Sequence, residues 1–153
     1  MKPESIQCNN QPCASVGNTA LLNQHKIGLF CSRKCPAGII MEAYDRFKDW
    51  AGDPEKTIIS GFHSPVEKTC FKLLLTGKAN IILCPARDLE NLRILKEWKP
   101  ALEEGRMLIL SPFKERRSDK QTTFQRNALV AQLAEERYAP YLSPDSDLRK
   151  ILK

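Results

Sequence analysis

The chain has 153 residues, of which 24 are lysine or arginine and 18 are aspartate or glutamate, so its formal net charge at pH 7 is +6. This length suits one domain with a full hydrophobic core, and we expect a single domain over residues 1–153. No apolar run approaches the roughly 20 residues that cross a bilayer, and the N-terminus lacks the apolar segment of a signal peptide. The sequence therefore predicts a cytoplasmic protein without membrane contact, whose positive charge favours nucleic acid as a partner.

Six cysteines occur in the sequence: Cys8, Cys13, Cys31, Cys35, Cys70 and Cys84. In a chain without a signal peptide, reduced thiols are expected rather than disulfides. The last two fall in apolar segments and are expected to pack in the core. The first four have C-x4-C and C-x3-C spacings, not the C-x2-C spacing of a zinc ribbon, so plain thiols are favoured and no metal is predicted. A reactive thiol in the loop at residues 31–35 stays open, because Arg33, Lys34 and a helix N-terminus would lower its pKa.

In chain order, short apolar segments alternate with helical patterns. Residues 1–15 are polar, contain two prolines and show no periodicity, which predicts an irregular N-terminal arm. Strands are predicted at residues 26–31, 57–59, 80–83 and 107–110, with a final short strand at 137–141. Helices are predicted at residues 20–24, between Pro36 and Asp53, and at 65–76, 89–104 (with a break before Pro100), 122–133 and 148–152. This alternation, with its short connections, predicts an α/β fold with a mostly parallel sheet and helices on both faces.

The helix between Pro36 and Asp53 carries apolar residues at helical spacing, which are expected to pack in the core rather than to stack on bases: Ile40, Ala43, Tyr44, Phe47 and Trp50. Two other helices have terminal signals. Gly77 is expected to end the helix at 65–76 as a C′ glycine. Thr122 and Gln125 have the spacing of a capping box, which predicts the start of the helix at 122–133.

The stretch KIGLFCSRKCP, residues 26–36, has the strand–turn–helix pattern with which doubly wound proteins bind anions. In an open parallel sheet, ligands bind beyond the carboxyl ends of the strands. The residues predicted there, or in the first turn of the helix at 122–133, supply hydroxyls, a glycine, a histidine and arginines: Ser32, Arg33, Ser60, Gly61, His63, Ser111, Arg126 and Asn127. Such groups bind phosphate, so we predict a nucleic-acid or phosphate site built from these residues.

Some of these residues also have a simpler interpretation. Ser60 and Ser111 can satisfy backbone groups of their own turns, and His63 is more often a loop hydrogen-bonder than a catalytic base. The carboxylates near the strand ends, Glu67 and Asp88, do not form a convincing acid–base pair. The motifs G-x-G-x-x-G, G-x-x-x-x-G-K-[ST] and G-x-S-x-G are absent, so neither a cofactor nor a catalytic residue is predicted.

The order of these signals resembles the DNA-processing protein A (DprA/Smf) family, which belongs to a wider group with the LOG proteins. The family's G-S-R corresponds to residues 31–33 and its S-G-x-A-x-G-I-D to residues 60–67. Its G-x-x-x-S-E-x-P resembles residues 105–113, and its F-x-x-R-N-R-x-I-A-x-L resembles residues 124–133. The resemblance covers residues 26–133, but Cys31 and Pro65 stand where the family has glycines. The P-G-G-x-G-T-x-x-E run of the LOG enzymes is absent.

The resemblance implies a Rossmann-like three-layer αβα fold with a mostly parallel sheet of four to six strands. It also implies binding of single-stranded DNA in a basic pocket and a role in DNA recombination or uptake, with Arg33 as a phosphate contact and Arg126 and Asn127 as parts of the pocket. A recombinase partner and a homodimer are left open. The alternative is a sensor or carrier of a small nucleotide or phosphorylated ligand. An enzyme on such a ligand is less favoured, and its candidate groups are Cys31, His63 and Glu67.

Overall fold

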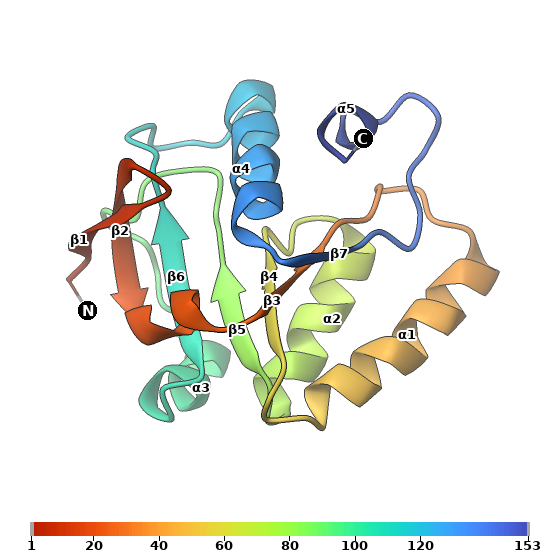
Figure 1. Ribbon diagram of the computed structural model, residues 1–153, viewed down its shortest axis with the longest axis horizontal. Helices are drawn as coiled ribbons and strands as arrows, with labels where there is room; N and C mark the ends of the chain where they lie inside the picture. The colour runs from red at the N-terminus through yellow and green to blue at the C-terminus, as the bar shows by residue number, and fades with distance from the viewer. Residues whose placement is uncertain (1, 153) are drawn as a thin grey trace.

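The computed structural model describes residues 2–152. These residues form one sheet of seven strands in the order β1-β2-β6-β5-β4-β3-β7 (Figure 1). The strands are β1 (Glu4–Cys8), β2 (Gln11–Gly17), β3 (Lys26–Leu29), β4 (Thr57–Ser60), β5 (Asn80–Leu83), β6 (Met107–Ser111) and β7 (Glu136–Tyr138). The strands from β6 to β7 in this order pair in parallel, whereas β1–β2 and β2–β6 are antiparallel. The expected mostly parallel α/β sheet is confirmed, with seven strands in place of four to six.

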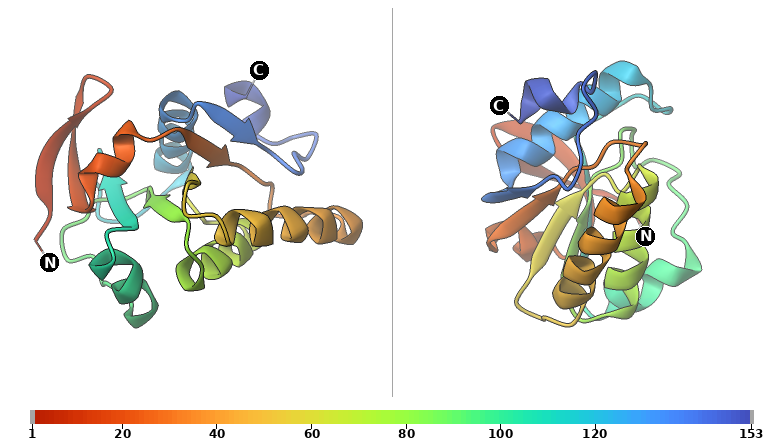
Figure 2. Two further views of the ribbon diagram at one scale, coloured as in Figure 1. Left: turned by 60° about the horizontal axis from the view of Figure 1, so that its bottom comes forward. Right: turned by 90° about the vertical axis from the view of Figure 1, so that its right-hand side faces the viewer.

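Helices cover both faces of this sheet. They are α1 (Ala37–Ala51), α2 (Pro65–Thr76), α3 (Lys99–Glu103), α4 (Lys120–Leu133) and α5 (Leu148–Ile151), with the 3-10 helices η1 (Thr19–Asn23) and η2 (Lys96–Trp98). The first three α-helices lie on one face, and α4 and α5 lie on the other (Figure 2). Ile58 and Ile81 pack in the core under the first layer, and Ile59 and Ile82 pack under the second. Burial on both faces explains why the middle of β4 and of β5 consists of consecutive isoleucines, with no alternation of apolar and polar residues. None of the described helices is long and apolar enough to cross a bilayer.

The irregular arm predicted for residues 1–15 is wrong, because most of this segment belongs to the sheet. β1 and β2 form a hairpin with a two-residue turn, in which Asn9 and Asn10 have φ angles of 52° and 66°. Asparagine tolerates this left-handed conformation better than most residues, so the pair is a turn signal that the prediction of an irregular arm did not use. The hairpin buries Cys8 and Cys13 and covers the edge of β6, which would otherwise be free to pair with another chain.

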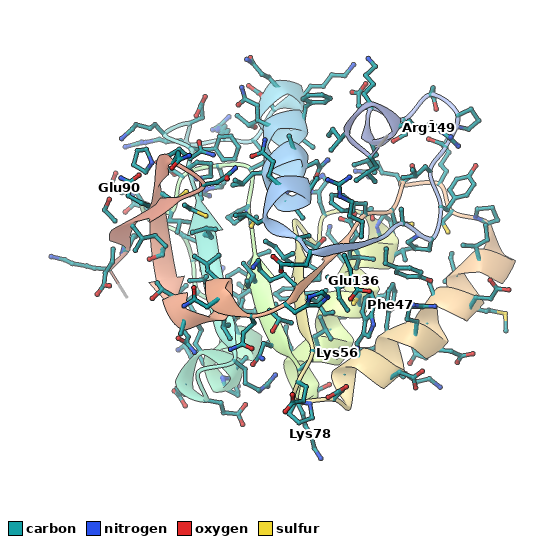
Figure 3. All side chains as sticks on the ribbon, viewed as in Figure 1. Phe47, Lys56, Lys78, Glu90, Glu136 and Arg149 are labelled. Carbon is teal, nitrogen blue, oxygen red and sulfur yellow. The ribbon has the colours of Figure 1, made fainter. Side chains whose placement is uncertain are left out.

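The apolar stripe of α1 is only partly buried. Phe47 and Trp50 are in the core, and both rings contact Tyr138 of β7 edge-on. Phe47 points from α1 toward the sheet (Figure 3). Ile40 and Tyr44, which were expected in the core, are 38% and 40% exposed. The reason is that the N-terminal end of α1 reaches beyond the sheet and has no layer beneath it (Figure 2).

The helix predicted over residues 89–104 forms only at its C-terminal end. Asn91 has a φ angle of 60°, a left-handed conformation that interrupts a helix. Residues 89–95 are therefore a loop, and η2 and α3 follow it. Pro100 lies in the first turn of α3, where its missing N–H leaves no hydrogen bond unmade.

The ends of α2 and α4 show how two terminal signals differ from expectation. α2 spans residues 65–76 as predicted, but Gly77 has a φ angle of −97° and is not left-handed. A glycine is needed there because a Cβ would overlap the carbonyl oxygen of Ala51. α4 begins at Lys120, since Asp119 is its N-cap: the Asp119 carboxylate accepts the Thr122 N–H at 2.8 Å, and Thr122 Oγ1 accepts the Asp119 N–H at 2.8 Å. Thr122 is thus the N3 residue of the capping box and not its N-cap.

Candidate nucleic-acid interface

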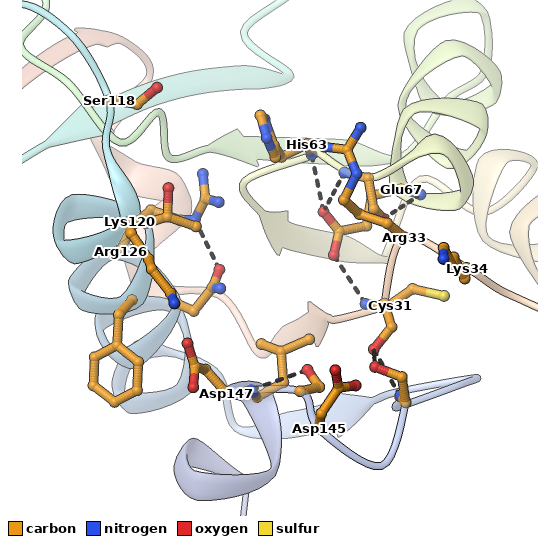
Figure 4. Close-up of a pocket in the computed structure, with 18 of the residues that line it drawn as sticks. Cys31, Arg33, Lys34, His63, Glu67, Ser118, Lys120, Arg126, Asp145 and Asp147 are labelled. Atoms are coloured by element: carbon orange, nitrogen blue, oxygen red, sulfur yellow. Dashed lines mark hydrogen bonds between the residues drawn. The ribbon is translucent and has the colours of Figure 1, made fainter.

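A cleft of about 750 Å³ opens at the carboxyl ends of β3 and β4. The start of α4 forms one wall, and the loop after β3 with the start of α2 forms the opposite wall (Figure 4). The C-terminal segment, residues 139–152, lies along a third side. The lining side chains include Arg33, Lys34, His63, Glu67, Lys120, Phe124, Arg126, Asn127, Asp145 and Asp147. The cleft lies where open parallel sheets bind their ligands.

Glu67 in the first turn of α2 joins the two loops that form the wall opposite α4. One carboxylate oxygen accepts the Cys31 N–H at 2.9 Å, and the other accepts the N–H groups of His63 at 2.9 Å and Ser64 at 3.2 Å. Burial raises the pKa of Glu67, while these three N–H groups and the nearby Arg126 oppose the rise. With both oxygens engaged by backbone donors, Glu67 is a positioning residue for the loops after β3 and β4.

Arg126 is the buried cation of the cleft, with 4% of its surface exposed. Its Nη1 donates to the Cys84 carbonyl at 3.1 Å, and its Nε donates to Oδ1 of Asn127 at 2.8 Å. Burial lowers the pKa of Arg126 and the nearby Glu67 raises it, but a guanidinium remains charged in proteins. Gly61 lies directly against the guanidinium, where a Cβ would overlap it. Arg126 is thus held in a fixed orientation, and it lines the cleft.

Three further cations of the cleft are exposed: Arg33 and Lys34 after β3, and Lys120 at the start of α4. Among the described residues, none of these three forms an ion pair within 4.0 Å. His63 lies between the cationic walls. Burial lowers its pKa, and the charges of Arg126, Lys68 and Arg33 lower it further, which keeps the imidazole neutral at pH 7.

Acidic side chains also line the cleft. Asp119 is engaged in capping α4. Asp145 and Asp147 lie in the C-terminal segment, across the cleft from the cationic groups (Figure 4). The field in the cleft is therefore uneven, positive along α4 and the loop after β3 and negative along the C-terminal segment.

The structure brings together five of the eight predicted site residues as lining of the cleft: Ser32, Arg33, His63, Arg126 and Asn127. Gly61 lies behind Arg126 and lines a smaller adjoining cavity of about 170 Å³. Ser60 and Ser111 line neither space. The Ser60 hydroxyl donates to the Leu29 carbonyl at 3.0 Å and accepts the Phe62 N–H at 3.0 Å.

The Ser111 hydroxyl likewise donates to the Arg87 carbonyl and accepts the Phe113 N–H at 3.1 Å. The geometry of these two serines therefore agrees with their simpler interpretation as groups that satisfy the backbone. Neither serine is therefore part of the candidate site.

Ser32 lines the cleft but is tied to the C-terminal segment. Its N–H donates to the Tyr141 carbonyl at 3.0 Å, and its hydroxyl accepts the Ser143 N–H at 2.9 Å. The lining residues of that segment were not found from the sequence, because nothing in the sequence pattern brings residues 143–148 back to the first loop. Lys120 and Phe124 on α4 could have been found, since helical spacing places them on one face with Asn127 once the cap at Asp119 is recognised.

Cys31 is not the reactive thiol that the sequence left open for the 31–35 loop. This residue is 2% exposed, and burial raises the pKa of its thiol to about 12, with Cys35 and Glu67 adding to the rise. The side chain is therefore a neutral thiol at pH 7 and a poor nucleophile. Arg33 and Lys34 of this loop line the cleft, and neither of them offsets the rise in the pKa of Cys31.

A mostly parallel sheet between two helical layers, with a cleft lined by cations beside its first βα loop, defines a Rossmann-like α/β protein. No protein-family model and no curated protein matches the sequence. In fold, the chain is similar to DNA processing protein A from Helicobacter pylori, whose structure describes a single-stranded DNA binding mode. The TM-score is 0.75 and the identity 19%, over 97% of this chain and 75% of that one.

The chain is also similar to DNA processing protein A (DprA) from Streptococcus pneumoniae, with a TM-score of 0.71 and 18% identity. This match covers 92% of the present chain and 51% of that one, so the chain spans about half of its length. The expected DprA-like Rossmann fold is confirmed by these two structures.

Proposed function

We propose that this chain binds single-stranded DNA through the cleft at the carboxyl ends of β3 and β4, and that it acts in DNA recombination or uptake. The observation that carries the proposal is the convergence of Arg33, Lys34, Lys120 and Arg126 on one cleft. The fold of DNA processing protein A, described in the H. pylori protein with a single-stranded DNA binding mode, supports the same function. A recombinase partner and a homodimer stay predictions.

The cleft offers the two kinds of contact that single strands need. Arg126 presents a pre-oriented guanidinium to a phosphate, and Arg33 can approach the same phosphate from the opposite wall (Figure 4). Phe124 is 37% exposed and lines the cleft near these cations, so its ring is available to stack on a base. Base–aromatic stacking beside a cationic groove is the common pattern of single-strand binding without sequence preference.

The test is fluorescence anisotropy with an end-labelled oligothymidine, measured against salt concentration. Each phosphate neutralised on a single strand contributes about −0.7 to the slope of log K against log salt. With three or four cations engaged, we expect a slope of about −2 to −3. A duplex of the same length should bind more weakly, because the cleft holds bases as well as phosphates. Absence of binding at low salt would refute the proposal.

The pH dependence of this binding is set by His63. Its pKa is lowered in the free protein, so the imidazole is neutral at pH 7 and gains a proton only at lower pH. A bound phosphate favours the charged form, and affinity for the oligonucleotide is therefore expected to rise as the pH falls from 7 to 5.5. In the free protein the same protonation costs stability, because the folded-state pKa lies below the unfolded one. Substitution His63→Gln should remove this rise in affinity between pH 7 and pH 5.5, measured by anisotropy at each pH.

The acidic side of the cleft gives an opposite prediction. A variant with Asp145→Asn and Asp147→Asn is expected to bind the oligonucleotide about threefold to tenfold more tightly at low salt, because two charges that repel phosphate are removed. The matched control is Glu42→Gln with Asp49→Asn, which removes two exposed carboxylates from α1, outside the cleft. Equal effects of the two variants would mean that net charge alone governs binding.

A small nucleotide is the second candidate ligand, and the size of the cleft favours it. About 750 Å³ lies within the range of about 300–1,000 Å³ that is usual for small-molecule pockets. A nucleotide at 100 times its Kd should add about 2.7 kcal/mol to the free energy of unfolding. Thermal shifts with mononucleotides and with oligothymidine therefore separate the two functions: a shift with the mononucleotide alone identifies a sensor or carrier.

A further inference from the structure

A second hollow, of about 970 Å³, lies on the other side of α2 from the cleft. It is a groove between α2 and residues 95–106, on the face of the sheet that carries α1, α2 and α3. Unlike the cleft, it is lined mostly by apolar side chains, among them Phe62, Phe71, Leu75, Leu95 and Trp98. Leu95 is 38% exposed, so this apolar side chain meets solvent at the groove. None of the residues that line the groove also lines the cleft of the proposed DNA site.

Three aromatic rings form one side of this groove. Phe62 and Phe71 are stacked, with centroids 4.7 Å apart and an interplanar angle of 19°. Trp98 meets Phe71 edge-on, with centroids 5.9 Å apart. Such a set of rings presents both a face and an edge, the two geometries in which a further aromatic ring packs favourably.

Phe62 is held in the groove by a strained backbone. Its φ angle is 47°, a left-handed conformation that is costly for a bulky residue. Its N–H donates to the Ser60 hydroxyl at 3.0 Å, which fixes the turn. Strain of this kind persists where surrounding contacts enforce it and is concentrated at ligand sites. Here it directs the Phe62 ring into the groove, while the next residue, His63, lines the cleft.

The charges at the rim are unequal. Lys68 and Lys72 lie four residues apart on α2, both are exposed, and neither has an ion pair within 4.0 Å among the described residues. On the opposite rim, Glu104 accepts from Nε of Arg106 at 2.9 Å. Arg106 also donates to three backbone carbonyls, so its charge is used within the fold. Glu97 is the remaining carboxylate, and the two lysines outnumber it.

We propose that this groove binds a planar aromatic small molecule that carries one acidic group. The rings and leucines would cover its apolar body, and Lys68 and Lys72 would bind the acidic group at the rim. The volume agrees with this class of ligand, because pockets for small molecules are mostly apolar, span about 300–1,000 Å³ and hold a few polar groups at their edge. The groove shares no lining residue with the cleft, and its proposed ligand does not depend on the proposed DNA binding.

Two fluorescent probes test the proposal: anilinonaphthalene sulfonate, and phenylnaphthylamine, which has the same rings without the sulfonate. We expect the sulfonate probe to bind one molecule per chain and to bind at least fivefold more tightly than the neutral probe. Substitutions Lys68→Gln with Lys72→Gln should bring the sulfonate probe to the affinity of the neutral one and leave the neutral probe unchanged. The matched control is Lys78→Gln with Lys99→Gln, which removes two exposed lysines outside the groove.

The apolar part of the site is tested by Phe71→Ala and Leu95→Glu, both of which should weaken both probes at least tenfold. Leu95→Glu changes an exposed residue, so folding is preserved even where Phe71→Ala reduces it. Equal affinity for the two probes, or no effect of Leu95→Glu, would overturn the proposal.

Two further outcomes would overturn it as well. Displacement of the probe by oligothymidine would assign the groove to the nucleic-acid site. A dimer in sedimentation that Leu95→Glu dissociates would assign the groove to a second copy of this chain. The cations of the proposed DNA site, Arg33 among them, do not line the groove. If the protein failed to bind DNA, the expected results with the two probes would therefore stay the same.

Discussion

Replacing Arg33 with alanine is expected to weaken binding of single-stranded oligothymidine by about tenfold to a hundredfold, with no change in the midpoint of thermal unfolding. The physical reason is that Arg33 is exposed and has no ion pair among the described residues, so its guanidinium is free to bind a phosphate. A charge-assisted hydrogen bond of this kind is worth about 1.5–3 kcal/mol, which corresponds to that loss of affinity. Anisotropy titrations at low salt, with a thermal melt of each variant, measure both quantities.

The matched control is Arg93→Ala. Arg93 is also exposed and unpaired among the described residues, but it lies in the loop before η2 and lines none of the cavities described above. It should lose less than threefold in affinity, since only the net charge has changed. The salt slope adds a second readout: Arg33→Ala should make it shallower by about 0.7, while Arg93→Ala should leave it unchanged. Equal losses in the two variants would show that the cleft has no specific phosphate contact at Arg33.

Two sequence matches to the family, in the first loop and in α4, agree with the structure to different degrees. The first-loop match is supported in position, because Arg33 lines the cleft although Cys31 replaces the glycine before it. The helix signature matches less closely: one residue separates Phe124 from Arg126, where the family pattern has two. Both side chains nevertheless line the cleft, since the N-terminal end of α4 projects over it. The resemblance therefore pointed to two segments that line the cleft, but it did not match residues 124–126 to the family pattern one by one.

The central parallel strands β3 to β6 could be predicted because each contains a short run of buried apolar residues and is followed by polar turn residues. The N-terminal hairpin could not be predicted. Its buried residues Cys8 and Cys13 are small, and neither strand shows a regular alternation of apolar and polar residues. Its turn of two asparagines was the one available signal. The start of α4 was misplaced by two residues because Thr122, the N3 partner of Asp119 in the capping box, is itself a residue type that often forms an N-cap.

The strand ends that form the candidate site could be predicted from the sequence. What each side chain contacts there could not. Sequence places Ser60 and Arg126 near one rim, yet it cannot show that the hydroxyl is consumed by the backbone or that the guanidinium lies on Gly61. It also gives no reason to expect carboxylates from residues 139–152 beside a phosphate site. These features depend on contacts between segments far apart in the chain, and no local pattern encodes them.

The role of Glu67 illustrates such a contact, and its removal is expected to have the largest effect on stability. Substitution Glu67→Ala leaves the N–H groups of Cys31, His63 and Ser64 without their acceptor. It also removes the carboxylate that compensates the buried charge of Arg126. Each buried donor left unpaired costs about 1–3 kcal/mol, so we expect a loss of about 3–5 kcal/mol in the free energy of unfolding by urea denaturation. Glu42→Ala, an exposed substitution on α1, should stay within about 0.5 kcal/mol of the wild type.

The effect of the same substitution on DNA binding separates positioning from charge. If Glu67 acted only through its charge, its removal would strengthen binding of a polyanion, as we expect for Asp145 and Asp147. Glu67 instead holds together the loops that carry Arg33 and His63. Its removal should therefore weaken binding about tenfold, because the phosphate contacts lose their fixed geometry. Glu67→Gln keeps one oxygen acceptor and should fall between the wild type and Glu67→Ala in stability. Tighter binding by a folded Glu67→Ala variant, measured by anisotropy below its unfolding transition, would show that the carboxylate does not position this site.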